Sequence, residues 1–300
     1  MEKIPVILDT DIGSDVDDTW ALVHLLNSPE LELTMVLVTG GDTRYRGAVA
    51  AKVLTIAGRT DVPVALGHRG EANCQFQEPW LGDFTLDSYL GLVYENGIGA
   101  AMNQLRRVPN TTIISIGTAA SIAAIAEQAP DCVPQTKIVG MYGSLRLGYG
   151  GNPPATLESN VRYGVPFFRT MIQAPWKDIL LTPLDTCDFA VLQGVNYQKV
   201  LASSAPLARS VLENYRIWAG LVNWMEVSQQ DLEEKSSTLF DTVAVYLAYD
   251  ESAVEVETLN IWATDEGLMV EDPAGPQVRL ATRWLKLDWF LKHLTERITA

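Results

Sequence analysis

Short apolar runs alternate with helical patterns along the first two thirds of the chain. The runs predict strands at Ile4–Leu8, Leu33–Thr39, Val62–Leu66, Thr111–Ile116, Lys137–Met141 and Ile179–Thr182. Apolar residues at helical spacing predict helices at Thr19–Leu26, Arg46–Ala57, Ala119–Glu127 and Pro166–Ile172. Because the strand runs are almost continuously apolar and alternate with helices, they predict a mostly parallel sheet covered by helices on both faces.

The last third of the chain has a more helical character. Residues from about 190 to 250 carry helical patterns, interrupted by the polar stretch Ser228–Ser237. The chain closes with the run Ala253–Trp262, a turn containing Gly and Pro, and a helix near Leu285–Ile298. No repeat, low-complexity stretch or linker divides it, and 300 residues are within the range of one open α/β fold. We therefore expect one domain over residues 1–300.

Charge and composition exclude several classes of partner. Lys and Arg number 22 against 37 Asp and Glu, a net charge of −15, and no run of basic residues occurs. Such a chain repels nucleic acid and anionic membrane surfaces. The first apolar run is soon followed by an aspartate, which is unlike a signal peptide. No stretch approaches the roughly 18 apolar residues of a membrane span. The three scattered cysteines do not have the spacing of metal ligands. These features predict a cytoplasmic protein with no membrane or nucleic-acid partner.

A dense acidic segment follows the first strand. It reads DTDIGSDVDD from Asp9 to Asp18 and holds five carboxylates in ten residues. Capping the following helix would use one or two acids, and the others would repel one another without compensation. A hard divalent cation, calcium or magnesium, supplies that compensation, since the ligands are all oxygen. The cation would acidify a bound water, and a ligating aspartate could take the water's proton.

Further polar motifs follow the later strands. They are Thr39-Gly40-Gly41-Asp42, Ile116–Ser121 (IGTAAS), Lys137–Gly143, Asn152 with Glu158-Ser159-Asn160, Pro183-Leu184-Asp185 and Asp241–Ala244 (DTVA). In this order, and with the acidic segment, they resemble the motifs of the nucleoside hydrolase family (inosine-uridine preferring and relatives). The resemblance covers roughly residues 4 to 250. It implies a Rossmann-like nucleoside hydrolase fold and calcium-dependent hydrolysis of a ribonucleoside to free base and ribose.

The resemblance also implies a role for each matching residue. Asp11 would contact Ca²⁺ and act as the general base on the cation-bound water that attacks C1′. Asp18 and Asp241 would be further carboxylate ligands, and Ala120 would add its backbone carbonyl oxygen. The expected substrate contacts are Asp17, Asp42, Asn152, Glu158, Asn160 and Asp241 around the sugar, and Trp80 and Trp224 on the base. Purine salvage and a homodimer or homotetramer are expected by resemblance only.

Two departures from the family pattern concern the carboxylates. Two more residues separate Asp11 from Asp17 than in the shorter DPGxDD form, so Asp15 could hold the sugar in place of Asp17. Asp42 stands where the family commonly has Asn, and it could either add charge to the site or cap the helix near Arg46. The cluster of Arg44, Tyr45 and Arg46 is itself typical of a surface or a helix start.

Other departures concern the leaving base. Phe240 precedes Asp241 where several family members carry a histidine thought to protonate the base. Trp80 and Trp224 could also be packing residues rather than stacking partners. His24 and His293 lie in helical patterns and are interpreted as structural, and His68 as a loop residue. The sequence does not fix the preferred base.

Two alternative functions fit part of the pattern. The run Leu8-Asp9-Thr10-Asp11 superficially fits a haloacid-dehalogenase-like phosphatase, with Asp9 as nucleophile, but leaves Asn152, Glu158 and Asn160 unexplained. A non-catalytic nucleoside or ribose binder is suggested by Phe240 and by Ala120 in place of the family threonine. The presence of Asp11 as a base favours the hydrolase over the binder.

Overall fold

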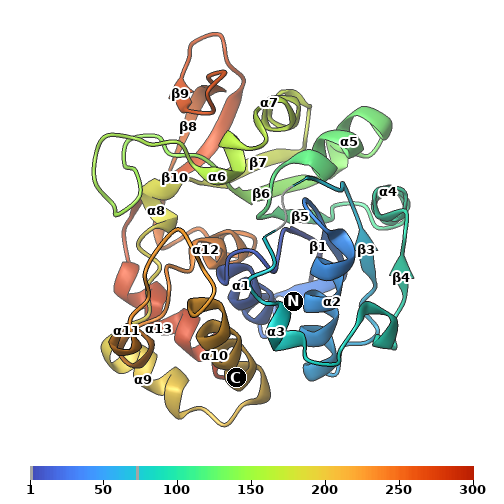
Figure 1. Cartoon of the computed structure of the whole chain (residues 1–300). Helices are drawn as coiled ribbons and strands as arrows, with labels where there is room; N and C mark the ends of the chain where they lie inside the picture. The colour runs from blue at the N-terminus through green and yellow to red at the C-terminus, as the bar shows by residue number, and fades with distance from the viewer. Residues whose placement is uncertain (1–2, 72–73) are drawn as a thin grey trace.

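The computed structural model describes residues 3–71 and 74–300, and its strands form one ten-stranded sheet (Figure 1). The order across the sheet is β4-β3-β2-β1-β5-β6-β7-β10-β8-β9. β1 to β7 and β10 run parallel, whereas β8 and β9 are antiparallel to their neighbours. The strands are β1 Ile4–Thr10, β2 Leu31–Val38, β3 Val64–Leu66, β4 Val93–Tyr94, β5 Thr112–Ser115, β6 Lys137–Met141, β7 Asp178–Thr182, β8 Val254–Ala263, β9 Met269–Glu271 and β10 Gln277–Trp284.

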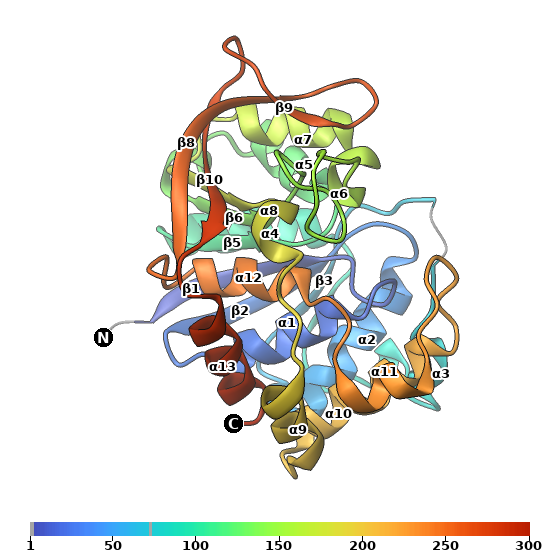
Figure 2. The same cartoon turned by 90° about the vertical axis from the view of Figure 1, so that its left-hand side faces the viewer.

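Helices cover both faces of the sheet. The helices are α1 Asp17–Leu26, α2 Thr43–Ile56, α3 Glu78–Leu81, α4 Gly97–Arg107, α5 Ala120–Gln128, α6 Ser159–Arg162, α7 Val165–Gln173, α8 Leu184–Cys187, α9 Gly194–Ala202, α10 Pro206–Ala219, α11 Gln229–Glu234, α12 Phe240–Leu247 and α13 Leu287–Ile298. Figure 2 shows α5 and α7 above the sheet and α1, α12 and α13 below it. Side chains of β1 alternate between these layers, because Val6 and Leu8 join one apolar cluster and Ile7 joins the other.

β1 lies at the point where the strand order reverses. The chain proceeds from β1 through β2, β3 and β4 on one side, and then through β5, β6 and β7 on the other. Backbone hydrogen bonds join the carboxyl ends across this point, from Thr39 N to Thr10 O at 2.8 Å and from Ile116 N to Asp9 O at 2.8 Å. Ligands of open parallel sheets bind at such a reversal, beyond the strand ends.

The predicted mostly parallel sheet with helices on both faces is confirmed, and the differences lie in the middle and toward the end of the chain. Strand β4 and helix α4 lie between Leu66 and Thr111, where no element was expected. The polar stretch Ser228–Ser237, which was expected to interrupt the helical region, contains the helix α11. Ser228 and Asp231 form a reciprocal capping box at the start of this helix. The run at Ala253–Trp262 is strand β8, which pairs with β10 in a long antiparallel ribbon that the apolar pattern did not predict. No helix in the described part of the chain is long and apolar enough to cross a membrane.

His24 is structural, as predicted, and lies in a buried polar cluster away from the strand ends. Its Nε2 is 3.1 Å from the hydroxyl of Tyr249, which is 2.8 Å from Nε2 of His293. Burial, reinforced by the charges of His293 and Arg297, lowers the pKa of His24 to about 3. The imidazole is therefore neutral in the folded protein over the physiological range.

This burial predicts an acid-dependent loss of stability. Unfolded His24 binds a proton below about pH 6.5, whereas the folded form does so only near pH 3, so the unfolded state binds more protons between these values. The contribution of His24 to the free energy of unfolding should fall by about 1.4 kcal/mol for each pH unit of acidification in this window. Urea titrations at several pH values should show a shallower dependence for His24→Gln. His68→Gln is the control, and equal slopes for His24→Gln and the wild type would contradict the assignment.

Candidate active site

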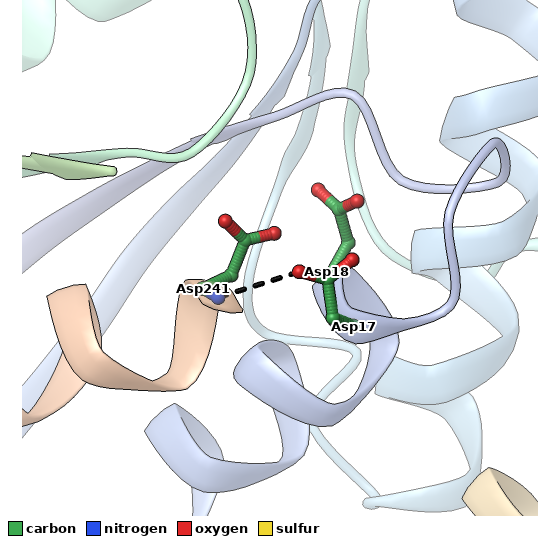
Figure 3. A group of neighbouring side chains, drawn as sticks. All are labelled: Asp17, Asp18 and Asp241. Atoms are coloured by element: carbon green, nitrogen blue, oxygen red, sulfur yellow. Dashed lines mark hydrogen bonds between the residues drawn. The ribbon is translucent and has the colours of Figure 1, made fainter. Parts of the chain in front are cut away.

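Three buried carboxylates come together at the carboxyl edge of the sheet (Figure 3). Asp17 and Asp18 lie in the first turn of α1 and Asp241 lies in the first turn of α12. One oxygen from each lies within 4.8 Å of the others, and none of the residues is more than 4% exposed. The amide of Asp241 donates to Oδ2 of Asp17 at 3.4 Å. The two helix starts therefore place carboxylates from distant parts of the chain side by side.

The electrostatics of this group favour a bound cation. Burial raises the pKa values of Asp17, Asp18 and Asp241 well above their usual range, and the neighbouring carboxylates raise them further. Because every donor is a hard oxygen atom, the group suits Ca²⁺ or Mg²⁺ and offers no soft ligand for zinc. A divalent cation would relieve the repulsion and keep all three groups ionised.

Asp11 stands beside this group and is more accessible to solvent. Its side chain is 25% exposed, and Oδ2 lies 3.9 Å from a guanidinium nitrogen of Arg46. Burial raises the pKa of Asp11, while the charge of Arg46 lowers it. The charge of Asp11 in turn raises the pKa values of Asp17, Asp18 and Asp241, as expected for carboxylates that face one site. An accessible carboxylate beside a buried cation site can accept a proton from a bound water.

Buried side chains fix the loop between β1 and α1. Arg46 donates to the carbonyl oxygen of Gly40 at 2.7 Å and to that of Ile12 at 3.0 Å. Three further donors reach the same loop: the Tyr45 hydroxyl to Gly13 O, the Gln77 amide to Asp15 O and the Trp218 indole to Ser14 O, at 2.9, 2.5 and 3.0 Å. These contacts from α2, α10 and the start of α3 orient Asp11 relative to the triad.

Comparison with known protein families assigns the chain that carries this site to a family. The family model described as inosine-uridine preferring nucleoside hydrolase matches residues 6–288. The chain belongs to this family. The nucleoside hydrolase resemblance of the sequence motifs is thereby confirmed, and the site lies where the acidic motif follows β1.

The names of similar proteins agree with this family assignment. A probable uridine nucleosidase 2 of Arabidopsis thaliana is 23% identical over 279 residues, covering 87% of this chain and 84% of the relative. A pyrimidine-specific ribonucleoside hydrolase RihA of Enterobacter sp. (strain 638) is 27% identical and covers 70% of this chain and 69% of its own length. Among solved structures, a plant nucleoside hydrolase, PpNRh1, matches with a TM-score of 0.82 at 20% identity, covering 100% of both chains. A purine-preferring ribonucleoside hydrolase from Gardnerella vaginalis matches with a TM-score of 0.76 at 20% identity, covering 98% of each chain.

The two sugar-binding alternatives, Asp15 and Asp17, both lie at the site of this nucleoside hydrolase. Asp17 is 4% exposed and belongs to the buried triad. Asp15 is half-buried, and its Oδ1 accepts the amide of Val16 at 2.6 Å. Burial and the charge of Asp11 raise the pKa of Asp15 to about 6. Asp15 thus adds a more accessible carboxylate at the margin of the triad.

Asp42 has a local structural role. Its Oδ1 accepts the backbone amides of Arg44 at 3.0 Å and Tyr45 at 3.3 Å, which caps the start of α2. This is the capping alternative that the sequence left open, and a substrate contact by Asp42 stays a prediction. Arg46 lies near the start of α2, one of the two positions expected for the Arg44-Tyr45-Arg46 cluster, but it is buried and faces Asp11.

Glu158 and Asn160 lie where the chain leaves β6 for α6. The Glu158 carboxylate accepts the amides of Asn160, Gly143 and Val161 at 2.6, 2.8 and 3.1 Å, and burial raises its pKa to about 7. The Asn160 amide donates to the carbonyl oxygens of Ile116 and Met141 at 3.3 and 3.1 Å. Asn160 therefore links the ends of β5 and β6, and Glu158 ties the start of α6 to Gly143 after β6.

Ala120 and Asn152 follow the same two strands. Ala120 begins α5 directly after the turn that follows β5, and its amide donates to Thr118 O at 2.8 Å. Asn152 is exposed and donates to Gly150 O at 2.7 Å within its own loop. The ligand role of the Ala120 carbonyl and the sugar contact of Asn152 stay predictions.

The two tryptophans occupy different environments. Trp80 is 3% exposed, its indole nitrogen is 3.3 Å from Glu213 of α10, and the Lys52 ammonium lies 4.5 Å from its ring centroid. These contacts favour packing over base stacking for Trp80. Trp224 is 50% exposed and packs edge-on against Phe76 and the buried Trp218. Trp224 is therefore the more accessible of the two tryptophans, and its contact with a base stays a prediction.

Proposed function

We propose that the protein hydrolyses the N-glycosidic bond of a ribonucleoside with water in a calcium-dependent reaction, releasing the free base and ribose. The observation that carries the proposal is the buried triad of Asp17, Asp18 and Asp241 with the accessible Asp11 beside it. Family membership supports the reaction class. The buried all-oxygen donors support a hard cation.

Asp11, Asp18 and Asp241 would hold the Ca²⁺ ion, together with the carbonyl oxygen of Ala120. When bound, the cation lowers the pKa of water and stabilises its conjugate base. Asp11 would then accept the proton of the attacking water. The contacts that Arg46 makes with the loop and with the Asp11 carboxylate hold Asp11 in place. The negative charge of the buried carboxylates stabilises the positive, oxocarbenium-like sugar that develops as the base departs.

The ribose hydroxyls would be held by Asp17 and Asn160, with Asp15 as the accessible alternative to Asp17. Asp17 lies in the triad, and Asn160 is a 9%-exposed residue of α6 that donates to Met141 O at the end of β6. The names of the relatives point to both classes of base, because two curated relatives are named for uridine or pyrimidine nucleosides and one solved structure for purine preference. A substrate panel therefore has to contain both uridine and inosine.

The proposal is tested by measuring ribose release from uridine, cytidine, inosine, adenosine and p-nitrophenyl riboside. We expect turnover of at least one natural nucleoside and of p-nitrophenyl riboside, whose leaving group departs as a stable anion. Calcium-linked binding of nucleosides without release of ribose would instead identify a non-catalytic binder. Release of phosphate from phosphoesters, with no ribose from nucleosides, would identify a phosphatase.

A matched pair of variants separates stacking from packing. Trp224→Ala is expected to lower turnover of natural nucleosides more than that of p-nitrophenyl riboside, because stacking assists departure of the base. Trp80→Phe is expected to lower the free energy of unfolding by about 1–2 kcal/mol and to leave the ratio between the substrates unchanged. Kinetics on both substrates and thermal melts measure these effects. An unchanged substrate ratio in Trp224→Ala would assign Trp224 to packing as well.

A further inference from the structure

The last residue of β1 carries a buried hydroxyl to which the proposed function gives no role. Thr10 is fully buried, and its side chain lies on the same face of the sheet as those of Val6 and Leu8, because side chains alternate along a strand. This is the face that α1 covers (Figure 2). The Thr10 hydroxyl reaches the first turn of α1, where it donates to Oδ1 of Asp18.

A second contact fixes the direction of this hydrogen bond. The backbone amide of Ile12 donates to Oγ1 of Thr10 at 3.1 Å. Because an amide N–H only donates, the threonine oxygen is the acceptor in that bond, and its own hydrogen is left for another partner. An ionised carboxylate only accepts, so Asp18 receives this hydrogen. Through one oxygen atom, Thr10 therefore ties the loop after β1 to the carboxylate of Asp18.

The orientation of the Asp18 carboxylate depends on this contact. Asp18 is 2% exposed, and its side chain accepts no other hydrogen bond from residues 3–71 and 74–300. One of its oxygens nevertheless lies within 4.8 Å of an oxygen of Asp17 and one of Asp241, although the three charges repel one another. Carboxylates that bind metals are themselves held by hydrogen bonds, and loss of such a partner costs about 10- to 100-fold in metal affinity or activity.

We propose that Thr10 is a positioning residue for the cation, and that it acts by holding the Asp18 carboxylate toward Asp17 and Asp241. The inference rests on the cation site of the proposed function. The strand end gives Thr10 a rigid base, because its carbonyl oxygen accepts the amide of Thr39 at 2.8 Å. A ligand that is already oriented does not have to be ordered when the cation binds, and the affinity for the cation is correspondingly higher.

The test measures the calcium dissociation constant by calorimetric titration of protein freed of divalent ions. Thr10→Val keeps the shape of threonine and removes the hydroxyl, and its dissociation constant is expected to rise about 10- to 100-fold. Thr10→Ser keeps the hydroxyl and should bind calcium nearly as tightly as the wild type. Thr182→Val is the matched control and should bind calcium as the wild type does. Thr182 is a buried residue at the end of β7, and its hydroxyl bonds Thr186 rather than a carboxylate.

A purely structural role of Thr10 predicts a different pattern. Loss of packing would affect Thr10→Ser, which lacks the methyl group, at least as much as Thr10→Val, and would lower the melting temperature without changing the calcium dissociation constant. Wild-type affinity in Thr10→Val, or equal losses of affinity in Thr10→Val and Thr10→Ser, would overturn the proposal. If Thr10→Val does not fold, Thr10→Ala removes the same hydroxyl and is judged by the same criterion.

A measurement of calcium binding also separates this inference from the proposed reaction. A wild type that binds calcium and releases no ribose would overturn the reaction, whereas weaker calcium binding by Thr10→Val would still support the role of Thr10. A wild type that binds no calcium would overturn the role of Thr10, whether or not it releases ribose.

Discussion

Replacing Asp11 with asparagine is expected to lower kcat/KM for the best nucleoside by at least about a thousandfold. Asparagine has nearly the same shape as aspartate but cannot accept the proton of the attacking water, a contribution of about 10²- to 10⁴-fold for a general base. It also removes one negative charge from the cation site. The Asp11 side chain is the accessible member of the carboxylate group, with 25% of its surface exposed.

Steady-state ribose release measures the effect, and Asp83→Asn is the matched control. Asp83 is an exposed aspartate after α3, so its variant should keep wild-type kinetics. Thermal melting in the presence of a chelator separates chemistry from folding. Asp11→Asn should melt no lower than the wild type there, since neutralising one of several neighbouring carboxylates relieves repulsion. Activity of Asp11→Asn within tenfold of wild type would end its assignment as the base.

Calcium should stabilise the wild type, and Asp241→Asn should lose most of that effect. A cation that binds only the folded state adds about 2.7 kcal/mol at 100 times its dissociation constant. Without the cation, Asp241 is buried against Asp17 and Asp18, and their mutual repulsion opposes folding. Asp241→Asn should therefore melt higher than the wild type in chelator and lower than it in excess calcium.

This reversal in the order of the two melting temperatures, as calcium is added, is specific to a cation site. Scanning calorimetry or fluorescence melts across a calcium titration record it, with Asp83→Asn expected to follow the wild type at every concentration. A cluster of carboxylates with no cation role predicts a different pattern, in which calcium moves neither protein. A calcium-induced shift in Asp241→Asn equal to that of the wild type would exclude Asp241 as a ligand.

The gathering of the carboxylates at one edge of the sheet was predictable from the sequence, because the acidic motifs follow strands of one parallel sheet. The acidic segment after β1 and Asp241 are more than 220 residues apart, yet strand ends and helix starts at one edge bring Asp17 and Asp241 within hydrogen-bonding distance, at 3.4 Å. The predicted core strands also agree closely with β2, β6 and β7. Local apolar pattern and chain order were sufficient for these features.

Contacts between distant segments were not predictable in this way. The sequence placed Arg46 at a surface or a helix start, and it does lie near the start of α2, but the burial of its guanidinium against Gly40 and Ile12 was not predicted. Trp80 is enclosed by Lys52 and Glu213, which approach from α2 and α10. Which side of a helix is buried depends on the tertiary packing, and one sequence does not specify it.

The antiparallel ribbon of β8 and β10 was missed for a related reason. β8 pairs one edge with β10 and exposes residues such as Glu255, so its apolar pattern is weaker than that of the central strands. β10 reaches the sheet by a parallel pairing of Arg279 with Leu180. The pairing of β10 with β7, about a hundred residues earlier in the chain, leaves no local signal in either strand.

The most direct test of the central claim is ribose release by the wild type as calcium is added back to chelated protein. We expect almost no release in chelator and full recovery with calcium, with the same half-saturating concentration as the calcium-induced rise in melting temperature. Equal half-saturating concentrations would show that one cation site supports both the stability of the fold and the hydrolysis. Undiminished release from nucleosides in chelator, with a melting temperature that calcium does not change, would contradict a catalytic cation at this site.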